Sequence, residues 1–262
     1  MDFLSEIKPL YSLSGFVVGA LVGMTGMGGG SLMTPALVLL FGIHPATAVG
    51  TDLLYAAITK SGGTVFHGIA RTVDWRIVRL LATGSIPTTI LTLLILANIG
   101  VNSDAARGLI TYVLSVALLA SAVALMFRDR FLALYSPELE TAPSQRTAGL
   151  TIAMGALLGV LVSISSVGAG SLGVTALLLL YPRRPLPVIV GSDIAHAVPL
   201  TLLGGLGHLY LGSVDWSLLG SLLVGSIPGI FVGSVAAGRF PERILRFVMA
   251  VMFVLIGLRL LF

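Results

Sequence analysis

Residues 26–32 read Gly-Met-Gly-Gly-Gly-Ser-Leu, and residues 165–172 read Ser-Ser-Val-Gly-Ala-Gly-Ser-Leu. Each stretch interrupts an apolar region and separates two short apolar segments, 11–26 from 31–42 and 147–164 from 171–181. Glycine lowers the preference for a helix and serine competes for backbone hydrogen bonds, so helices break at such places. The pattern therefore predicts two helical hairpins, each broken in the middle.

The remaining apolar segments are longer. At about 20 residues each, they are long enough to cross about 30 Å of hydrocarbon at 1.5 Å per residue. They lie near residues 46–69, 76–97, 105–127, 187–211, 216–237 and 243–262. Of the 262 residues, 56% are hydrophobic and only 10% are charged, and the mean hydropathy is +1.04. A soluble domain carries about 25% charged residues, so we expect an all-α polytopic membrane protein.

The two halves of the chain repeat one pattern. Gly30-Ser31-Leu32 matches Gly170-Ser171-Leu172 at an offset of 140, and beyond this point the offset is 141. The matches at 141 are Gly50 with Gly191, Asp52 with Asp193, His67 with His208, Val73-Asp74-Trp75 with Val214-Asp215-Trp216, and Gly84-Ser85-Ile86-Pro87 with Gly225-Ser226-Ile227-Pro228. Such a repeat indicates two copies of one structural unit. We assign residues 1–127 to the first repeat, 128–146 to a polar linker and 147–262 to the second repeat.

The basic residues indicate how the repeats are oriented, because cytoplasmic loops concentrate Lys and Arg. If each broken hairpin re-enters, returning to the side it came from, the second half is inverted and 11 bases face one side against 3 on the other. The 11 are Arg71, Arg76, Arg79, Arg128, Arg130, Arg146, Arg183, Arg184, Arg239, Arg243 and Arg246. If each hairpin crosses instead, the division is 8 against 6.

The bias favours the re-entrant arrangement, although the crossing arrangement stays open. We therefore expect two inverted repeats, each a re-entrant (broken) helical hairpin plus three transmembrane helices. The expected location is a bacterial inner membrane, with both termini outside the cytoplasm.

Composition and spacing also exclude several classes of function. The formal net charge is +4, but the bases stand at the edges of apolar segments, where they orient a protein in the membrane rather than bind nucleic acid. The chain has no cysteine, and no residue spacing typical of a metal site or a catalytic nucleophile is present. We therefore expect neither an enzyme nor a metal or other cofactor. The expected partners are the lipid bilayer and a small anionic substrate, and a homo-oligomer is left open.

The broken hairpins are the first candidate for a binding site, because inverted-repeat transporters bind substrates at broken helices near the membrane midplane. The helices that begin at Ser31 and Ser171 would each offer free N–H groups, a partial positive charge and a hydroxyl, which suits an anion. The alternative is close helix packing by small residues. The expected substrate-binding residues are Gly28, Gly29, Gly30, Ser31, Thr51, Lys60, Ser165, Ser166, Gly168, Gly170, Ser171 and Ser192.

Of the 11 acids, only Asp52 and Asp193 fall inside apolar segments, and Lys60 is the only base deep within one. Asp52 and Asp193 are repeat mates, and ionisable groups in a membrane are costly and usually functional. Each is a candidate for proton coupling, or alternatively for a structural hydrogen bond to the free N–H groups of a broken helix. Lys60 lies eight residues after Asp52 and about 80° around the helix, so a direct pair within that helix is not expected. Lys60 is left as a counter-charge for an anion or as a partner of an aspartate on another helix.

Three histidines complete the candidates for proton coupling or gating. His67 and His208 are repeat mates near the ends of two spans. His196 follows Asp193 by three residues, so that both share one helix face. Histidine titrates near neutral pH. The alternative for each of them is an interior histidine satisfied by hydrogen bonds.

At these positions the chain resembles the sulfite exporter TauE/SafE family of membrane proteins. The resemblance covers nearly the whole chain and is carried by residues 26–32, Gly50-Thr51, His67-Gly68 with 73–76, the run 181–193, and 225–229. It departs at Thr88, where the second repeat has Gly229 after its proline. The resemblance implies a secondary transporter that exports sulfite, sulfonates such as sulfoacetate, or related anions by alternating access. A passive anion channel is the alternative.

Overall fold

The computed structural model describes residues 8–25, 30–140, 144–236 and 241–262. These ranges form ten α-helices and contain no strand, which confirms the expected all-α class. The helices are α1 (Pro9–Thr25), α2 (Gly30–Phe41), α3 (Pro45–Ile69), α4 (Trp75–Ile99), α5 (Asp104–Glu140), α6 (Ser144–Ser165), α7 (Ser171–Leu180), α8 (Leu186–Tyr210), α9 (Trp216–Ala236) and α10 (Glu242–Leu261).

Six of these helices are long and apolar enough to cross a membrane, namely α4, α5, α6, α8, α9 and α10. α3 is as long as α4, at 25 residues, but Asp52 and Lys60 reduce its apolar character. α6 is longer than the short segment expected at 147–164, because the helix begins at Ser144 and includes the polar residues before the apolar stretch. α5 likewise continues to Glu140, so helix occupies much of the polar stretch 128–146.

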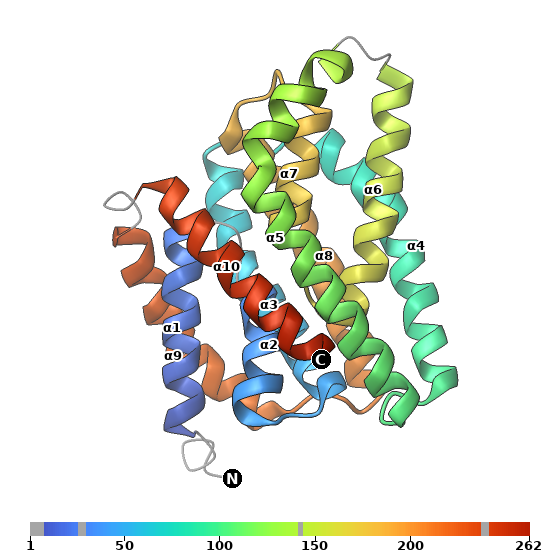
Figure 1. The fold of residues 1–262 in the computed structure, drawn as a ribbon, viewed down its shortest axis with the longest axis vertical. Coiled ribbons are helices and arrows are strands. Elements are labelled where there is room, and N and C mark those ends of the chain that lie inside the picture. The colour runs from blue at the N-terminus through green and yellow to red at the C-terminus, as the bar shows by residue number, and fades with distance from the viewer. Residues whose placement is uncertain (1–7, 26–29, 141–143, 237–240) are drawn as a thin grey trace.

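The course of the helices can be followed in Figure 1. α1 starts at the lower end of the view and runs upward, α2 runs back down, and α3 starts again at the lower end. α6 starts at the upper end and runs downward, α7 runs back up, and α8 starts again at the upper end. Each of the two short helices, α2 and α7, therefore returns towards the end at which its predecessor began.

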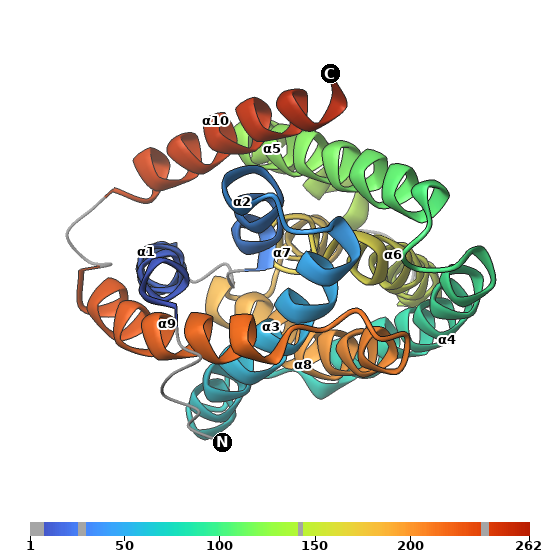
Figure 2. The ribbon, with the colours of Figure 1, turned by 90° about the horizontal axis from the view of Figure 1, so that it is seen from below.

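Helices of the two halves pack against each other in matching pairs. α1 packs on α9 and α6 packs on α4, so the first helix of each half lies on the fourth helix of the other half. α3 packs on its repeat mate α8, and α5 packs on its mate α10. Figure 2 shows α2, α3, α7 and α8 at the centre, with α1 and α9 at one end and α4 and α6 at the other. The two halves therefore interlock into one body around a core of four helices.

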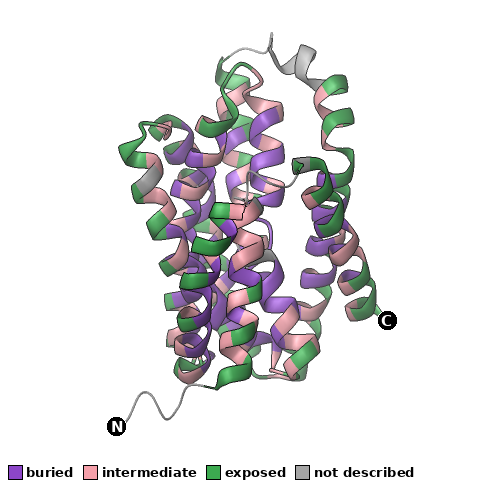
Figure 3. Ribbon diagram, turned by 90° about the vertical axis from the view of Figure 1, so that its left-hand side faces the viewer, coloured by how far each residue is buried: buried purple, intermediate pink, exposed green. Residues whose placement is uncertain are grey.

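The outer surface is apolar in a way that suits lipid. Figure 3 shows that buried residues gather inside the bundle, while exposed residues cover its outside. Among the exposed residues are large hydrophobic side chains of α9 and α10, such as Phe231, Ile227 and Leu255, which are 72%, 63% and 64% exposed. Apolar patches of this kind are rare on soluble monomers. The structure is therefore that of a polytopic membrane protein.

The segments that carry most of the described arginines lie at the upper end of the bundle in Figure 1. The described arginines at this end fall in the α3–α4 and α7–α8 connections, near the starts of α4, α6 and α10, and in the second half of α5. Lys8, Arg107 and Arg259 instead lie next to the start of α1, near the start of α5 and at the end of α10, towards the lower end. At the upper end, Arg246 of α10 pairs with Asp129 of α5 at 3.2 Å.

Glycines bring α1 and α9 into backbone contact. A Cβ atom added to any of them would collide with the main chain of the facing helix; they are Gly15, Gly19 and Gly23 of α1 and Gly225, Gly229 and Gly233 of α9. The spacing of four residues places each set on one helix face. The repeat mate of this contact, between α6 and α4, uses Gly155 and Gly84 in the same way. Small residues that let backbones approach closely are typical of membrane helix packing.

Gly225→Ala tests this contact. The added methyl group would meet the carbonyl oxygen of Ser12, and overpacking of this kind costs about 1–3 kcal/mol. We expect a lower midpoint of thermal unfolding for the protein purified in detergent. The control is Gly108→Ala on the exposed face of α5, where a Cβ atom meets nothing within 4 Å. Equal stability of the two variants would contradict the contact.

Candidate functional site

The break between α6 and α7 lies at residues 166–170, as the sequence predicts. Ser166 has a φ of +58°, and Gly168 and Gly170 have φ values of +122° and +115°. The last two conformations favour glycine, because a side chain would be strained there. All five residues of the break are buried, so the interruption lies inside the protein.

The backbone at this break carries free donors. In α7, the N–H groups of Leu172 and Gly173 donate to the carbonyl oxygen of Gly168, and that of Val174 donates to Gly170. Within the described part of the chain, the N–H groups of residues 168–171 make no hydrogen bond. Buried backbone N–H groups without a partner are rare in native proteins. Four such donors in succession, at the start of a helix, form a candidate anion site.

The matching break in the first repeat includes Gly28 and Gly29, which lie outside the described residues. Gly30 and Ser31 begin α2, but the Ser31 side chain is likewise outside the description. The geometry of the candidate site therefore comes from the second repeat. There Ser171 is buried, and its hydroxyl donates to the Ser121 hydroxyl of α5 at 2.9 Å. Ser165 is also buried and donates to the carbonyl oxygen of Leu161 in its own helix.

Asp52 of α3 ties that helix to α2. Its Oδ2 accepts hydrogen bonds from the backbone N–H of Thr34, at 3.1 Å, and from the Thr34 hydroxyl, at 2.6 Å. Both residues are fully buried. Asp52 therefore makes the kind of structural bond to a broken helix that the sequence left as one of two alternatives.

Asp193 of α8 occupies the equivalent position with different contacts. Its carboxyl group lies against Gly173 of α7, where a Cβ atom would collide with Oδ1. The repeat mate of Thr34 is Thr175, but its hydroxyl donates to Ser171 in its own helix at 2.8 Å. Among the described residues, no hydrogen bond reaches the Asp193 carboxyl group. The two repeat mates thus differ: Asp52 is held by two donors and Asp193 by none.

Lys60 of α3 lies next to the break. It is 6% exposed, and its Nζ donates to the carbonyl oxygen of Ala169 at 3.4 Å. It interacts electrostatically with both Asp193 and Asp52, although no nitrogen–oxygen pair within 4 Å joins it to either carboxylate in the described structure. Lys60 therefore interacts with both carboxylates electrostatically, over distances longer than an ion pair.

Two further side chains complete this group. His196 of α8 is fully buried, with Nε2 at 2.8 Å from the Ser85 hydroxyl of α4 and Nδ1 without a partner among the described residues. Ser166 lies beside the carboxyl group of Asp52. We call this set the central cluster, and its members are Asp52, Lys60, Ser166, Asp193 and His196.

Thr51 and Ser192 join helix ends across the two halves. The Ser192 hydroxyl accepts from the backbone N–H of Asp74 at 2.8 Å, and the Thr51 hydroxyl accepts from that of Asp215 at 3.1 Å. Asp74 in turn caps α4 through the N–H of Arg76. The expected substrate-binding residues Thr51 and Ser192 therefore bind the connections that precede α9 and α4.

His67 and His208 lie at the same two connections. His67 Nδ1 is 2.7 Å from the Thr72 hydroxyl, and His208 Nδ1 is 3.0 Å from that of Ser213, the repeat mate of Thr72. His208 is fully buried and its Nε2 also contacts the carbonyl oxygen of Ser163, whereas His67 is half-buried. Both histidines thus contact the interhelical connections.

Sequence reasoning missed several neighbours of the central cluster. Ser85 contacts His196, and Tyr55, the repeat mate of His196, lies beside Ser226, the repeat mate of Ser85. The offset of 141 contained the signal, since it relates both pairs. Thr34 was missed because nothing in its local pattern separates it from other threonines in apolar helices.

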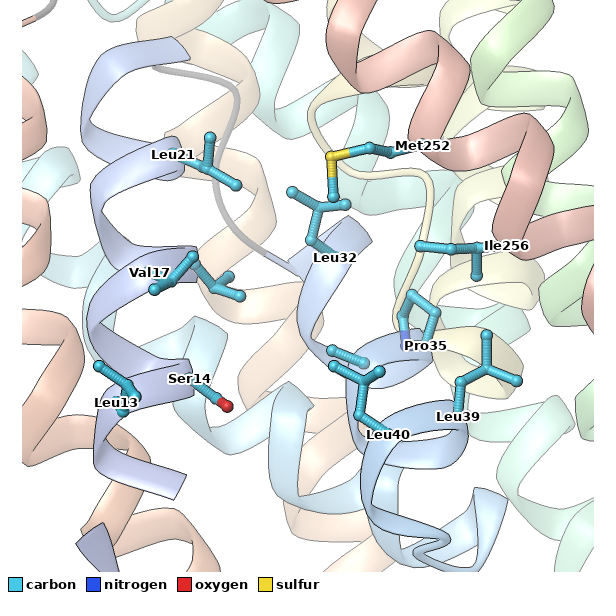
Figure 4. A pocket seen from close by; sticks show the side chains of 12 residues that line it. Leu13, Ser14, Val17, Leu21, Leu32, Pro35, Leu39, Leu40, Met252 and Ile256 are labelled. Atoms are coloured by element: carbon cyan, nitrogen blue, oxygen red, sulfur yellow. The ribbon is translucent and has the colours of Figure 1, made fainter. Parts of the chain in front are cut away.

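A separate cavity of about 450 Å³ lies between α1, α2 and α10. Figure 4 shows side chains of the three helices, such as Val17, Leu32 and Ile256, pointing into it. All of its lining residues are apolar except Ser14, so the cavity is unsuited to an anion. In the described part of the chain, no cluster of three histidine or acidic side chains could hold a metal ion.

Comparison with known proteins gives one family. The pattern that defines the sulfite exporter TauE/SafE family matches residues 11–260. The probable membrane transporter protein YjnA of Bacillus subtilis (strain 168) is 39% identical over 252 residues, which cover 95% of this chain and 98% of that protein. A probable membrane transporter protein of Xylella fastidiosa (strain 9a5c) is 27% identical over 78% of this chain and 75% of its own length. No solved structure matches the chain.

Thr34→Val tests the bond between α2 and α3. The substitution keeps the shape of the side chain but removes the hydroxyl that donates to Asp52, so we expect a loss of about 1–2 kcal/mol of unfolding free energy. Thr175→Val is the matched control, because that hydroxyl bonds only within its own helix. Thermal unfolding in detergent measures both variants. An equal or larger loss in Thr175→Val would contradict the difference between the two carboxylates.

Proposed function

The chain belongs to the sulfite exporter TauE/SafE family, and we propose on this basis that it is a secondary transporter. Its proposed substrates are small sulfur-containing anions, such as sulfite and sulfonates like sulfoacetate, which it exports by alternating access. The observation that carries the proposal is the row of free N–H groups at residues 168–171 beside the buried ammonium of Lys60.

The proposed substrate site combines a helix start with a cation. The N-terminus of α7 carries a partial positive charge, and its free N–H groups are suited to the oxygens of a sulfite or sulfonate group. The Lys60 ammonium supplies a full charge at the same place, because its Nζ contacts Ala169 within the break. Low-dielectric surroundings strengthen both contributions. The break at residues 26–29 is the proposed counterpart from the first repeat.

We propose that the two halves are inverted repeats that place the two breaks opposite each other. This is supported by the opposite courses of the α1–α2 and α6–α7 hairpins in Figure 1 and by the matching pairs α1 with α9 and α6 with α4. The arginine-rich upper end then faces the cytoplasm. The start of α1 and the end of α10, which lie towards the lower end, face the outside of the cell. In a bacterial inner membrane, the negative interior would favour anion exit by about 2.3 kcal/mol per charge per 100 mV.

Alternating access requires that the two ends of the α3–α8 pair open in turn. The bonds of Ser192 to Asp74 and of Thr51 to Asp215 join the halves at opposite ends of this pair. The Asp74 side chain also pairs with Arg184 at 2.9 Å. We propose that these contacts form and break alternately, because each of them links one half of the protein to the other.

Transport by the purified protein in proteoliposomes tests the function. We expect saturable uptake of sulfoacetate or sulfite that is accelerated when the vesicles are preloaded with the same anion. Lys60→Met should raise the half-saturating concentration about tenfold or more, since contacts to charged groups are worth about 1.5–3 kcal/mol. Ser61→Ala, at an exposed neighbour whose hydroxyl bonds only its own helix, is the control. Currents far above carrier turnover would indicate a channel, and no flux of either anion would exclude the proposed substrates.

The proposed orientation can be tested because the chain contains no cysteine. Asn102→Cys lies between α4 and α5 and Gln145→Cys lies at the start of α6, and both residues are exposed. A membrane-impermeant maleimide added to intact spheroplasts should label Asn102→Cys and leave Gln145→Cys unlabelled until the membrane is opened. The reverse pattern would invert the orientation, and labelling of both from one side would refute the inverted arrangement.

A further inference from the structure

We propose that each anion crosses the membrane together with one proton, and that Asp193 carries this proton while Asp52 has a structural role. The inference rests on the proposed function, because it assigns a second ion to the same site. It starts from the central cluster, where two carboxylates and one ammonium are buried together. A group of this composition lacks one positive charge, and low-dielectric surroundings make that imbalance costly.

An entering anion would increase the imbalance. If the anion contacts Lys60, the ammonium is shared among three negative groups, and the carboxylate that depends on it most gains affinity for a proton. Linkage is reciprocal, so protonation of that carboxylate strengthens anion binding by the same factor. The expected consequence is joint binding of anion and proton, which then move in the same direction.

The hydrogen bonds distinguish the two carboxylates. Asp52 accepts from the N–H and the hydroxyl of Thr34, and two donors stabilise the ionised form of a carboxylate. Asp193 accepts no hydrogen bond from the described residues, and the charged side chain that stabilises its ionised form is Lys60. Its carboxyl group also faces Gly173, three residues beyond the break. The ionised form of Asp193 therefore loses most of its electrostatic stabilisation when an anion at the break binds Lys60.

The helices packed against α8 bring few other titratable groups towards Asp193. α3 contributes Lys60, Asp52 and Tyr55, as well as His67, which lies against Gly191, and α7 contributes no ionisable side chain. The ionisable groups of α4 and α6 are exposed arginines near their starts, namely Arg76, Arg79 and Arg146. On α8 itself, His196 faces Lys60 and contacts Ser85. The His196 Nε2 is already 2.8 Å from the Ser85 hydroxyl, whereas the Asp193 carboxyl group has no hydrogen bond among the described residues.

A proton suits this site better than a metal cation. A sodium ion needs several oxygen ligands and would add to the charge of the Lys60 ammonium, which is buried near both carboxylates. A proton needs only one carboxylate oxygen. The step is balanced: a proton from cytoplasmic water binds an Asp193 oxygen as the anion binds the α7 start and Lys60, and both leave on the other side. A dianion then crosses with one net negative charge, so the membrane potential still favours its exit.

The test uses the full chain in proteoliposomes, with sulfoacetate as the probe and a trapped dye that reports internal pH. Sulfoacetate stays a dianion between about pH 6 and 8, since carboxyl groups titrate near about pH 4, so any proton movement belongs to the protein. In the wild type we expect about one proton per sulfoacetate in the same direction. Saturable sulfoacetate exchange without proton movement would overturn this inference and leave the proposed function intact. Absence of sulfoacetate transport would remove both.

Asp193→Asn separates the two roles. In Asp193→Asn we expect sulfoacetate exchange at equal pH on both sides to remain and proton movement to be lost. Asp52→Asn should still move about one proton per sulfoacetate, whatever its transport rate. Proton movement that persists in Asp193→Asn would overturn the assignment. If Asp193→Asn does not fold, Asp193→Glu must still move protons with sulfoacetate. Loss of proton movement in Asp52→Asn, with exchange preserved, would assign the proton to Asp52 instead. A sodium gradient that drives the wild type without proton movement would also refute the proposal.

Discussion

The satisfaction of backbone hydrogen bonds away from water is the constraint on which the rest of this structure depends. A membrane-spanning helix bonds its own N–H and C=O groups, so a break in it must be enclosed by protein. The break at residues 166–170 is buried, and α5, α6 and α8 pack on the helix that follows it. The central position of α7 in Figure 2 agrees with this requirement.

Enclosing a break in this way requires helices that approach closely. The glycine faces of α1 and α9, and the equivalent ones of α6 and α4, permit backbone contact between the two halves. Because each half supplies one helix to each of these pairs, neither half has its complete packing without the other. The pairs α1–α9 and α4–α6 flank the bundle. The carboxylates of Asp52 and Asp193, the Lys60 ammonium and the free N–H groups at residues 168–171 lie between these two pairs.

Most of the fold could be predicted from the sequence, because apolar length and the repeat offset are local patterns. They located the helices and the break after Ser165. The contacts of the site were less predictable. Asp52 and Asp193 stand in nearly identical surroundings in the sequence, yet only Asp52 receives donors. That difference arises because the α2 start presents Thr34 to α3, whereas the α7 start presents Gly173 to α8. Such a difference depends on the relative position of two helices, which the repeat pattern does not contain.

The two repeats therefore share one backbone arrangement and one pair of aspartates, but the other side chains of the central cluster differ between them. Lys60 corresponds to Thr201, whose hydroxyl donates to Ala197 within its own helix, and His196 corresponds to Tyr55. A second lysine at position 201 would give each carboxylate its own counter-charge. With a single ammonium for two carboxylates, the centre remains one positive charge short in a medium where that shortage is costly. Repeat symmetry thus accounts for the position of the cluster, and the loss of symmetry at Lys60 leaves the charge imbalance from which the proposed proton site is inferred.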